Sequence, residues 1–321
     1  MAKKILDRVR AAIRTRHYSY KTEQAYVHWI ARFIRFHQMR HPETLGKREV
    51  EAYLSHLAVK CNVAASTQNL ALSSILFLYR HVLEVELPWL DDVVRVKRPP
   101  RLPVVLTREE VKQILILLRS PQDLIVQLLY GSGLRISEAL RLRVKDIDLP
   151  RRSLIVRDGK GGKDRVTVLA ERCREPLRRQ MAAARERGRL DRESGCGGVL
   201  LPKALDRKYP TARYEPGWQF VFYAHRPSAN PQTGEVGRHH ILDSTVQKAV
   251  RRAARECRIA KPVTCHTFRR SFATHLLETG SDIRTIQKLL GHSDVRTTMI
   301  YTHIVERGAM GARSPLDDED V

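Results

Sequence analysis

A basic segment rich in proline divides this sequence into two parts. Residues 93–107 read VVRVKRPPRLPVVLT, with prolines at positions 99, 100 and 103. Because proline lacks an amide hydrogen and fixes its own φ, this segment cannot continue a helix and is typical of an extended tether. The stretches on either side show helical patterning, and each is long enough for its own core. We therefore expect three parts: a domain over residues 1–90, a linker over 91–106 and a second domain over 107–321.

Apolar side chains in the first part recur at helical spacing. Ala25, Trp29 and Phe33 are spaced by four residues, so they share one helical face and are expected to pack in a core. The same kind of spacing occurs in two further stretches, 48–60 and 66–83. The sequence predicts a small helical bundle over residues 1–90.

The second part combines helices with one clear β-hairpin. Thr107 and Glu110 form a capping-box pattern at the start of a helix, and further helical segments surround the glycines at 131 and 133. SLIVRD and DRVTVL then flank the turn GKGGK, which carries Lys160 and predicts a hairpin. Helical patterning returns at 174–188 and from Ser244 onward, with a less regular insertion at about 188–240 between them. The predicted fold class is mainly α with a small antiparallel β-sheet.

The charge of the chain favours a polyanionic partner. Lys and Arg number 58 against 35 Asp and Glu, which gives a net charge of +23. No apolar run approaches the roughly 18 residues of a membrane span, and arginines interrupt the apolar residues at the start, so we expect neither a membrane segment nor a signal peptide. The five cysteines form no CxxC pair, which indicates free thiols and no metal site. A cytoplasmic protein that binds nucleic acid fits these features.

Polar residues that suit phosphodiester chemistry cluster near the end of the sequence. His266 and Arg269 are three residues apart on a predicted helix and share a face, whereas we assign Cys265 and His275 to packing. The next helix is expected to begin at an N-cap, Ser281, and to end at a glycine, Gly291, which places His292 on the turn and Tyr301 on the following segment. Cationic and imidazole side chains could therefore surround one tyrosine hydroxyl: Arg135, Lys160, His266, Arg269 and His292.

Four motifs carry a resemblance to a known family. GSGLRISE, GKGGKDRVTVL, HTFRRSFATHLL and LLGHSDVRTTMIYTH occur in this order, and together they resemble the motif set of the tyrosine recombinases of the phage-integrase type. Their wording is most similar to that of the integron integrases. The resemblance implies a helical N-terminal DNA-binding domain and a catalytic domain that close around DNA as a C-shaped clamp. One departure is Arg270, where many relatives have histidine.

The resemblance also implies a mechanism with six catalytic residues: Arg135, Lys160, His266, Arg269, His292 and Tyr301. Tyr301 would attack the scissile phosphorus and form a 3′-phosphotyrosyl link with a free 5′-hydroxyl. Arg135 and Arg269 would hold the non-bridging oxygens, the two histidines would hydrogen-bond or move protons, and the hairpin lysine would protonate the leaving oxygen. No metal, nucleotide or other cofactor is expected.

The insertion and the linker supply the expected DNA-binding residues. Trp218, Phe220 and Phe222 alternate as on a strand, and the two phenylalanines are expected in the core. For Trp218 two places stay open, the same core or a surface that faces DNA. The insertion resembles the segment by which integron integrases recognise extrahelical bases of a folded single-stranded hairpin, which implies that Trp218 and His239 or His240 grip such a base. Further basic residues are expected to contact DNA: Lys208 in the insertion, and Arg95, Lys97, Arg98 and Arg101 in the linker.

Three functions fit these features. The first is a site-specific recombinase that works on duplex and hairpin sites as a homotetramer, because in this family a segment such as 302–321 docks into a neighbouring protomer. The others are a DNA-relaxing enzyme like topoisomerase IB and a DNA-binding protein without catalytic activity. Another phage-type or chromosome-dimer-resolving recombinase is an alternative to the integron assignment. The first function is favoured, in the cytoplasm of a bacterium and associated with the nucleoid.

Overall fold

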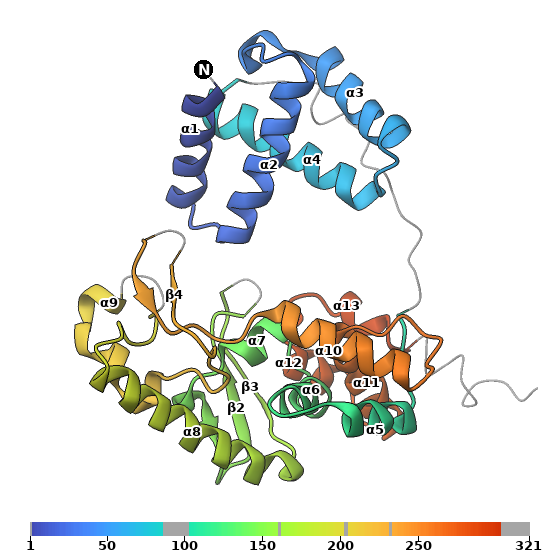
Figure 1. The fold of residues 1–321 in the computed structure, drawn as a ribbon. Coiled ribbons are helices and arrows are strands. Elements are labelled where there is room, and N and C mark those ends of the chain that lie inside the picture. Colours follow the sequence, from blue (N-terminus) through green and yellow to red (C-terminus); the bar gives the residue numbers. More distant parts are fainter. Residues whose placement is uncertain (1, 86–102, 160–161, 202–204, 231–232, 303–321) are drawn as a thin grey trace, which may run out of the picture. The chain divides into compact units, whose positions relative to one another are not determined.

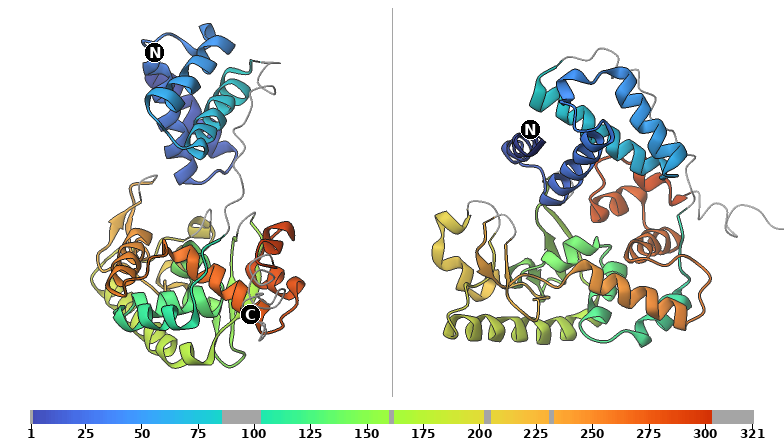
Figure 2. Two further views of the ribbon diagram at one scale, coloured as in Figure 1. Left: turned by 90° about the vertical axis from the view of Figure 1, so that its right-hand side faces the viewer. Right: turned by 45° about the horizontal axis from the view of Figure 1, so that its top comes forward.

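The chain forms two compact units, Met1–Arg101 and Leu102–Val321. The computed structural model describes residues 2–85, 103–159, 162–201, 205–230 and 233–302. Figures 1 and 2 draw both units. Five of the predicted site residues lie outside the described residues: Arg95, Lys97, Arg98, Arg101 and Lys160.

Over its described residues, 2–85, unit 1 is a bundle of four helices: α1 (Ala2–Thr15), α2 (Tyr20–Phe36), α3 (Lys47–Ser55) and α4 (Ala65–Leu78). A short 3₁₀ turn lies between α2 and α3, and single π-helical turns extend α3 and α4: η1 (Pro42–Thr44), η2 (His56–Lys60) and η3 (Tyr79–Leu83). Helix α2 contacts both α1 and α4 (Figure 1). Ser19 caps α2, since its side chain accepts a hydrogen bond from the Thr22 amide.

Two apolar clusters hold unit 1 together. Trp29 and Phe33 are buried among α3 and α4 side chains, so the packing role predicted for Trp29 is confirmed. A second cluster joins α1 to α2 and α4 through Ile5, Val9 and Ile13. These three residues are four positions apart and form one stripe of α1, a helix that was not among the predicted segments.

Unit 2 contains nine helices among the residues that the structure describes: α5 (Arg108–Leu117), α6 (Gln122–Gly131), α7 (Ile136–Arg141), α8 (Arg174–Glu193), α9 (Leu205–Lys208), α10 (Asp243–Glu256), α11 (Cys265–Glu278), α12 (Ile283–Leu290) and α13 (Arg296–Met299). Short 3₁₀ turns occur between them: η5 (Val144–Asp146), η6 (Glu171–Cys173), η7 (Pro210–Tyr214) and η8 (Pro216–Trp218). Its main core gathers apolar residues of α5–α8, α10, α11 and the sheet. Cys265 and His275 of α11 are buried, as predicted.

The larger sheet of unit 2 has three antiparallel strands in the order β1 (Ile147–Asp148), β2 (Ser153–Val156) and β3 (Arg165–Val168). Strands β2 and β3 are the predicted hairpin, with Val156 opposite Arg165. A second sheet pairs β4 (Ser228–Ala229) with β5 (Val236–Gly237). The predicted class, mainly α with a small antiparallel sheet, is confirmed.

Helix starts in unit 2 follow local hydrogen bonding. Thr107 and Glu110 form the predicted capping box: the Thr107 hydroxyl accepts from the Glu110 amide, and the Glu110 carboxylate accepts from the Thr107 amide. The predicted N-cap of α12 was wrong by one residue. Asp282 is the N-cap and accepts from the Thr285 amide at 2.9 Å, whereas the amide of Ser281 donates to Leu276 at the end of α11.

The segment between α8 and α10 lies at the end of unit 2 away from α5 and α11 (Figure 1). Trp218, Phe220 and Phe222 do not form a strand, because Pro216 begins the 3₁₀ turn η8 and only isolated bridges, at Phe220 and Tyr223, occur before β4. Phe220 and Phe222 are nevertheless buried, as predicted. Arg238 holds this segment to α8 by forking onto the buried Asp191 carboxylate.

Two further observations concern composition. All five cysteines are free thiols in the structure. Among the described residues, no helix combines the length and apolar character that crossing a bilayer requires.

Candidate active site

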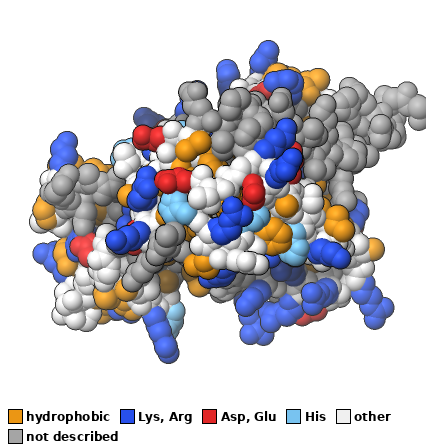
Figure 3. All heavy atoms as spheres, turned by 90° about the horizontal axis from the view of Figure 1, so that it is seen from above, with side chains coloured by type: hydrophobic (Ala, Val, Ile, Leu, Met, Phe, Trp, Pro, Cys, Tyr) orange, Lys and Arg blue, Asp and Glu red, His pale blue; other side chains and the backbone are white. Residues whose placement is uncertain are grey.

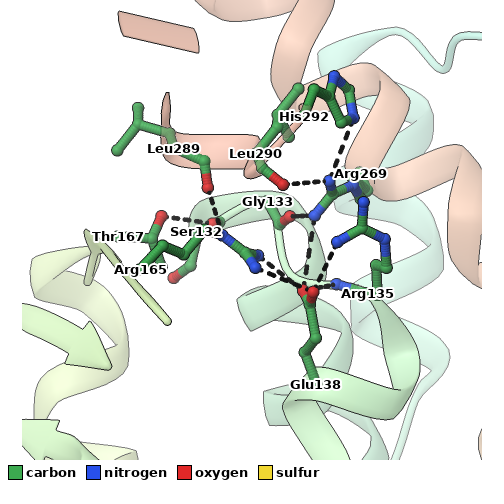
Figure 4. Close-up of polar contacts among 10 residues, drawn as sticks. All are labelled: Ser132, Gly133, Arg135, Glu138, Arg165, Thr167, Arg269, Leu289, Leu290 and His292. Atoms are coloured by element: carbon green, nitrogen blue, oxygen red, sulfur yellow. Dashed lines mark hydrogen bonds and ion pairs between the residues drawn. The ribbon is translucent and has the colours of Figure 1, made fainter. Parts of the chain in front are cut away.

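The buried carboxylate of Glu138 is the centre of a cluster of three arginines (Figure 4). It accepts a forked pair of hydrogen bonds from Arg165, 2.9 Å to Oε1 and 2.7 Å to Oε2. Arg135, the N-cap of α7, donates its backbone amide to Oε2 at 2.8 Å and Nη1 to Oε1 at 2.6 Å. Burial raises the pKa of Glu138, but the hydrogen bonds from Arg165 and the Arg135 amide outweigh it and hold the pKa at about 2. Glu138 is therefore ionised at neutral pH.

Arg269 of α11 joins the cluster from the other side. Its Nη1 donates to the Gly133 carbonyl and lies 3.6 Å from Glu138 Oε2, and its Nη2 donates to the Leu290 carbonyl at 2.6 Å. Gly133 has a φ of +64°, and a Cβ there would lie 2.5 Å from the Phe272 ring, so only glycine lets this loop approach α11. Burial and the charge of Arg135 lower the pKa of Arg269, while Glu138 opposes that shift.

His292 follows the left-handed C-cap of α12 and points toward Arg269 (Figure 4). Its Nε2 lies 3.3 Å from Arg269 Nη2, and its Nδ1 lies 2.9 Å from the Thr298 hydroxyl. Because a guanidinium only donates, Nε2 must accept, which places the ring proton of neutral His292 on Nδ1. The contact with Thr298 fixes that orientation.

Tyr301 and His266 lie within electrostatic range of the same arginines. Tyr301 is 7% exposed and packs in a small apolar cluster with Phe272 and Leu290. Burial raises the pKa of Tyr301, while Arg269, Arg270 and Arg135 lower it. Burial also lowers the pKa of His266, and the same three arginines lower it further. At neutral pH the tyrosine is a phenol and His266 is neutral, so His266 can accept a proton.

The structure thus brings together five of the six residues predicted for catalysis, and Lys160 lies outside the described residues. Arg135, Arg269 and His292 are linked by the contacts above, and the charges on the first two act on His266 and Tyr301. Sequence reasoning gave neither Arg165 nor Glu138 a role in the site. The local signal for Glu138 is the RISE capping pattern, whereas Arg165 has no local signal, because its partners come from α7 and α12.

A cavity of about 270 Å³ opens beside this cluster and is lined by polar and charged residues: Arg135, Ser137, Glu138, Arg141, Arg157, Asp158 and Gly159. Arg141 is exposed and makes no hydrogen bond or ion pair with the residues that the structure describes. Figure 3 shows Lys and Arg side chains spread over the face drawn, with fewer acidic side chains among them. The arginines that line the cavity, Arg135, Arg141 and Arg157, suit an anionic group such as a phosphodiester.

The residues predicted to grip a base meet in one row of rings and cations. Lys145 Nζ lies 2.8 Å from the centre of the half-buried Trp218 ring, and the Arg143 guanidinium lies 5.3 Å from it. Arg143 also covers Phe220 at 4.2 Å. On Phe220, in turn, pack the rings of His239 and His240, whose centres are 4.0 Å apart.

Burial sets the protonation of the two histidines. It lowers the pKa of His239, and it lowers the pKa of His240 to about 4, so both rings are neutral at physiological pH. His240 Nδ1 donates to the Ile241 carbonyl at 2.7 Å. Lys208, the remaining predicted contact of the insertion, is exposed, and its Nζ lies 5.1 Å from the centre of the Tyr209 ring.

Comparison with known proteins decides the family. Residues 104–307 match the model of the phage integrase family, and residues 5–89 match that of the phage integrase N-terminal SAM-like domain. The chain belongs to the phage integrase family, the tyrosine recombinases. This recombinase is 53% identical over 314 residues to an integrase/recombinase of Escherichia coli, a match that covers 98% of this chain and 93% of that protein. It is 33% identical over 275 residues to tyrosine recombinase XerD of Agrobacterium fabrum, a match that covers 80% of this chain and 76% of that protein.

Solved structures share the fold of the recombinase. A lambda integrase(75-356) dimer bound to a COC′ core site aligns with a TM-score of 0.63 at 18% identity, over 97% of this chain and 98% of that chain. XerH recombinase bound to difH substrate aligns with a TM-score of 0.60 at 18% identity, over 98% of this chain and 85% of that chain. Family and relatives together confirm the predicted enzyme class, a site-specific recombinase.

Proposed function

We propose that this recombinase cuts and rejoins DNA through a covalent bond to Tyr301. The phenolic oxygen attacks the scissile phosphorus, the bond to the 5′-oxygen breaks, and the products are a 3′-phosphotyrosyl link and a free 5′-hydroxyl. The phosphodiester energy is retained in the new ester, so the reverse attack by a 5′-hydroxyl rejoins a strand without ATP.

The charges of the cluster support this assignment. Arg135, Arg165 and Arg269 bring three positive charges to one carboxylate, which leaves an excess of two in a largely buried site. A phosphodiester and the second charge of its pentacoordinate transition state would balance that excess. Guanidinium forks suit the non-bridging oxygens better than ammonium groups do.

Each step that moves or holds a proton is assigned to one side chain. We assign His266 as the group that accepts the Tyr301 proton, since its lowered pKa keeps it neutral. His292 is assigned to the phosphate, next to Arg269. Lys160, which lies between β2 and β3 in the sequence, is assigned as the acid that protonates the leaving 5′-oxygen.

The observation that carries this proposal is that the charges of Arg135 and Arg269 act on Tyr301, while Arg269 also contacts His292. Its test is covalent capture. A pool of duplexes with randomised sequence and one nick is mixed with the protein in EDTA without ATP. Cleavage beside the nick releases a short fragment, so the adduct accumulates and its DNA can be sequenced. We expect a denaturant-resistant adduct that Tyr301→Phe abolishes while DNA binding is retained.

Tyr18→Phe is the matched control, because Tyr18 is 45% exposed in unit 1 and loses the same hydroxyl. It should form the adduct at the wild-type rate. An adduct that persists in Tyr301→Phe, or cleavage that strictly requires Mg²⁺, would contradict the proposal.

We further propose that the substrates are integron sites, including folded single-stranded hairpins with extrahelical bases, and that the reaction moves gene cassettes. The row formed by Trp218, Phe220 and the two histidines supports this, because rings beside cations are how proteins stack unpaired bases and hold the backbone. Trp218 is partly exposed at one end of the row, where a base could add to the stack.

Binding to fully paired DNA and to DNA with bulged bases is compared, to distinguish a base-stacking role of Trp218 from a purely structural one. Trp218→Ala should weaken binding to a hairpin with bulged bases by about 1–3 kcal/mol and leave binding to a fully paired site nearly unchanged. Tyr209→Ala, which removes an aromatic ring that is 49% exposed in the same segment, should affect neither. Equal losses on both DNAs for Trp218→Ala would remove the integron assignment and leave the tyrosine chemistry in place.

For the assembly we propose a homotetramer on DNA in which residues after Tyr301 dock into a neighbouring protomer. Of the residues concerned, 302–321, all but Thr302 lie outside the described part of the chain. Deleting them should preserve binding of one protomer to a half-site but abolish strand exchange, which gel shift and product analysis can measure. Strand exchange at the wild-type rate would contradict the docking. We place the reaction in the bacterial cytoplasm, on the nucleoid.

A further inference from the structure

Arg165 connects three elements that carry the candidate catalytic groups. It is the first residue of β3, and its side chain is 10% exposed. Its two Nη atoms fork onto Glu138 of α7, and its Nε donates to the Leu289 carbonyl in the last turn of α12 at 2.9 Å. Figure 4 shows this side chain reaching from the strand to both helices.

The Arg165 guanidinium binds the same Glu138 carboxylate that Arg135 and Arg269 contact. Each Glu138 oxygen accepts one bond from Arg165 and one from Arg135. Arg269 comes no closer than 3.6 Å to Oε2 and is held instead by the carbonyls of Gly133 and Leu290. The strongest geometry around Glu138, a bidentate fork, therefore belongs to an arginine that is not assigned to the phosphate.

The end of α12 is held by the same pair of arginines. Arg165 binds the Leu289 carbonyl, Arg269 binds the Leu290 carbonyl, and His292 follows two residues later. Gly291 lies against Arg165: a Cβ at this position would be 2.7 Å from Arg165 Cδ. The position of His292 thus depends on the Arg165 side chain.

We propose that Arg165 is a positioning residue that neutralises Glu138 and thereby keeps Arg135 and Arg269 available to the scissile phosphate. Without Arg165, the carboxylate would draw both arginines toward itself and would repel the charged phosphate. The end of α12 would also lose one of its two side-chain anchors. This inference rests on the proposed tyrosine chemistry and adds a residue to which the predicted mechanism gives no role.

The test compares a charged and an uncharged scissile group. The substrate is the nicked duplex recovered by covalent capture, made once with its ordinary phosphodiester and once with a methylphosphonate at the cut, which lacks the negative charge. Cleavage is followed in a single turnover at saturating protein, so that binding does not limit the rate. Arg165→Gln should slow cleavage of the phosphodiester by about 100-fold, the size expected for misplaced binding groups.

On the methylphosphonate the same variant should lose less than about tenfold relative to wild type, because no phosphate charge is left for Glu138 to repel. Arg165→Lys keeps the positive charge but not the fork, and should fall between the wild type and Arg165→Gln on the phosphodiester. Equal losses on the two substrates would mean that Arg165 supports the fold alone and would overturn the proposal. So would wild-type cleavage by Arg165→Gln.

A matched variant and a parallel reaction complete the design. Arg14→Gln removes another Arg–Glu fork, between Arg14 and the buried Glu23 of unit 1, and should cleave both substrates at wild-type rates. A loss in Arg14→Gln as large as that in Arg165→Gln would also overturn the proposal. Tyr301→Phe is run alongside, since an adduct in that variant refutes the tyrosine chemistry itself, whereas unchanged rates in Arg165→Gln refute only the role of Arg165.

Discussion

Glu138 Oε2 lies 3.6 Å from Arg269 Nη1, although the two residues belong to helices far apart in the sequence. This distance is within ion-pair range but too long for a hydrogen bond. The buried Arg269 is therefore balanced by a carboxylate that is already bonded to two other arginines. A charge arranged in this way is stabilised in the free protein and can still interact with an incoming phosphate.

Replacing Glu138 tests whether its negative charge, placed among three arginines, stabilises the folded protein. Its pKa of about 2 lies below the ordinary value of 4.5, so its contribution is fully present above about pH 4.5 and is lost as the pH falls toward 2. Glu138→Gln should lower the free energy of unfolding at pH 7 by about 3 kcal/mol, measured by urea denaturation.

The deficit should shrink when the titration is repeated at about pH 3.5. Glu186→Gln, which removes an exposed carboxylate of α8, should change stability little at either pH. A deficit for Glu138→Gln that is independent of pH would show that packing, and not charge, explains the loss.

Two glycines with left-handed backbone conformations distinguish the effect of backbone strain from the effect of a clash with Arg165. Gly280 has a φ of +85° and no atom within 4 Å of a Cβ placed there, whereas Gly291 has a φ of +64° and faces Arg165. Gly280→Ala should cost about 1 kcal/mol of stability from backbone strain and leave cleavage unchanged. Gly291→Ala should cost more and also slow cleavage, because it displaces Arg165. Equal behaviour of the two variants in both assays would refute this reading of Gly291.

The cleavage rate should depend on pH in one direction only. The lowered pKa of His266 means that its ring is neutral and able to accept a proton above about pH 6.5, and protonated only below. Single-turnover cleavage should be flat from about pH 7 to pH 9 and should fall only on the acid side of pH 6.5, approaching tenfold per pH unit. A rate that climbs steadily between pH 7 and pH 9 would instead indicate direct loss of the phenolic proton of Tyr301.

The basic linker should contribute to the salt dependence of DNA binding. Each phosphate contact that is lost should reduce the slope of log affinity against log salt by about 0.9. Four substitutions to glutamine test this together: Arg95, Lys97, Arg98 and Arg101. The control removes the same number of positive charges elsewhere, with glutamine at Arg172 of η6 and at Arg178, Arg179 and Arg185 of α8. If the two sets flatten the slope equally, net charge explains the effect and the linker has no special contact.

The sequence was informative where local patterns carry the structure. The capping box at Thr107 and the hairpin of β2 and β3 follow from neighbouring residues. Helix α1 was missed although Ile5, Val9 and Ile13 have the same four-residue spacing as Ala25, Trp29 and Phe33. At the start of the chain only the length of uninterrupted apolar runs was considered, and the arginines break those runs.

Arg165 shows where local reasoning ends. The alternation in β3 would favour Val166 and Val168 as the inward residues, yet both are exposed, and Arg165 and Thr167 face the interior. Their partners explain this: Thr167 donates to the Ser132 carbonyl, and Arg165 reaches Glu138. Both partners precede the strand by about thirty residues and meet it only in the folded unit. No pattern within the strand reports them.

The most direct test of the central claim is to locate the covalent bond. The adduct formed on the nicked duplex is digested with nuclease and trypsin, and the peptide that keeps a nucleotide is sequenced by mass spectrometry. The account predicts a 3′-nucleotide on the peptide TTMIYTHIVER, residues 297–307, with the modification on Tyr301. A nucleotide attached to any other residue, or through its 5′-phosphate, would contradict it.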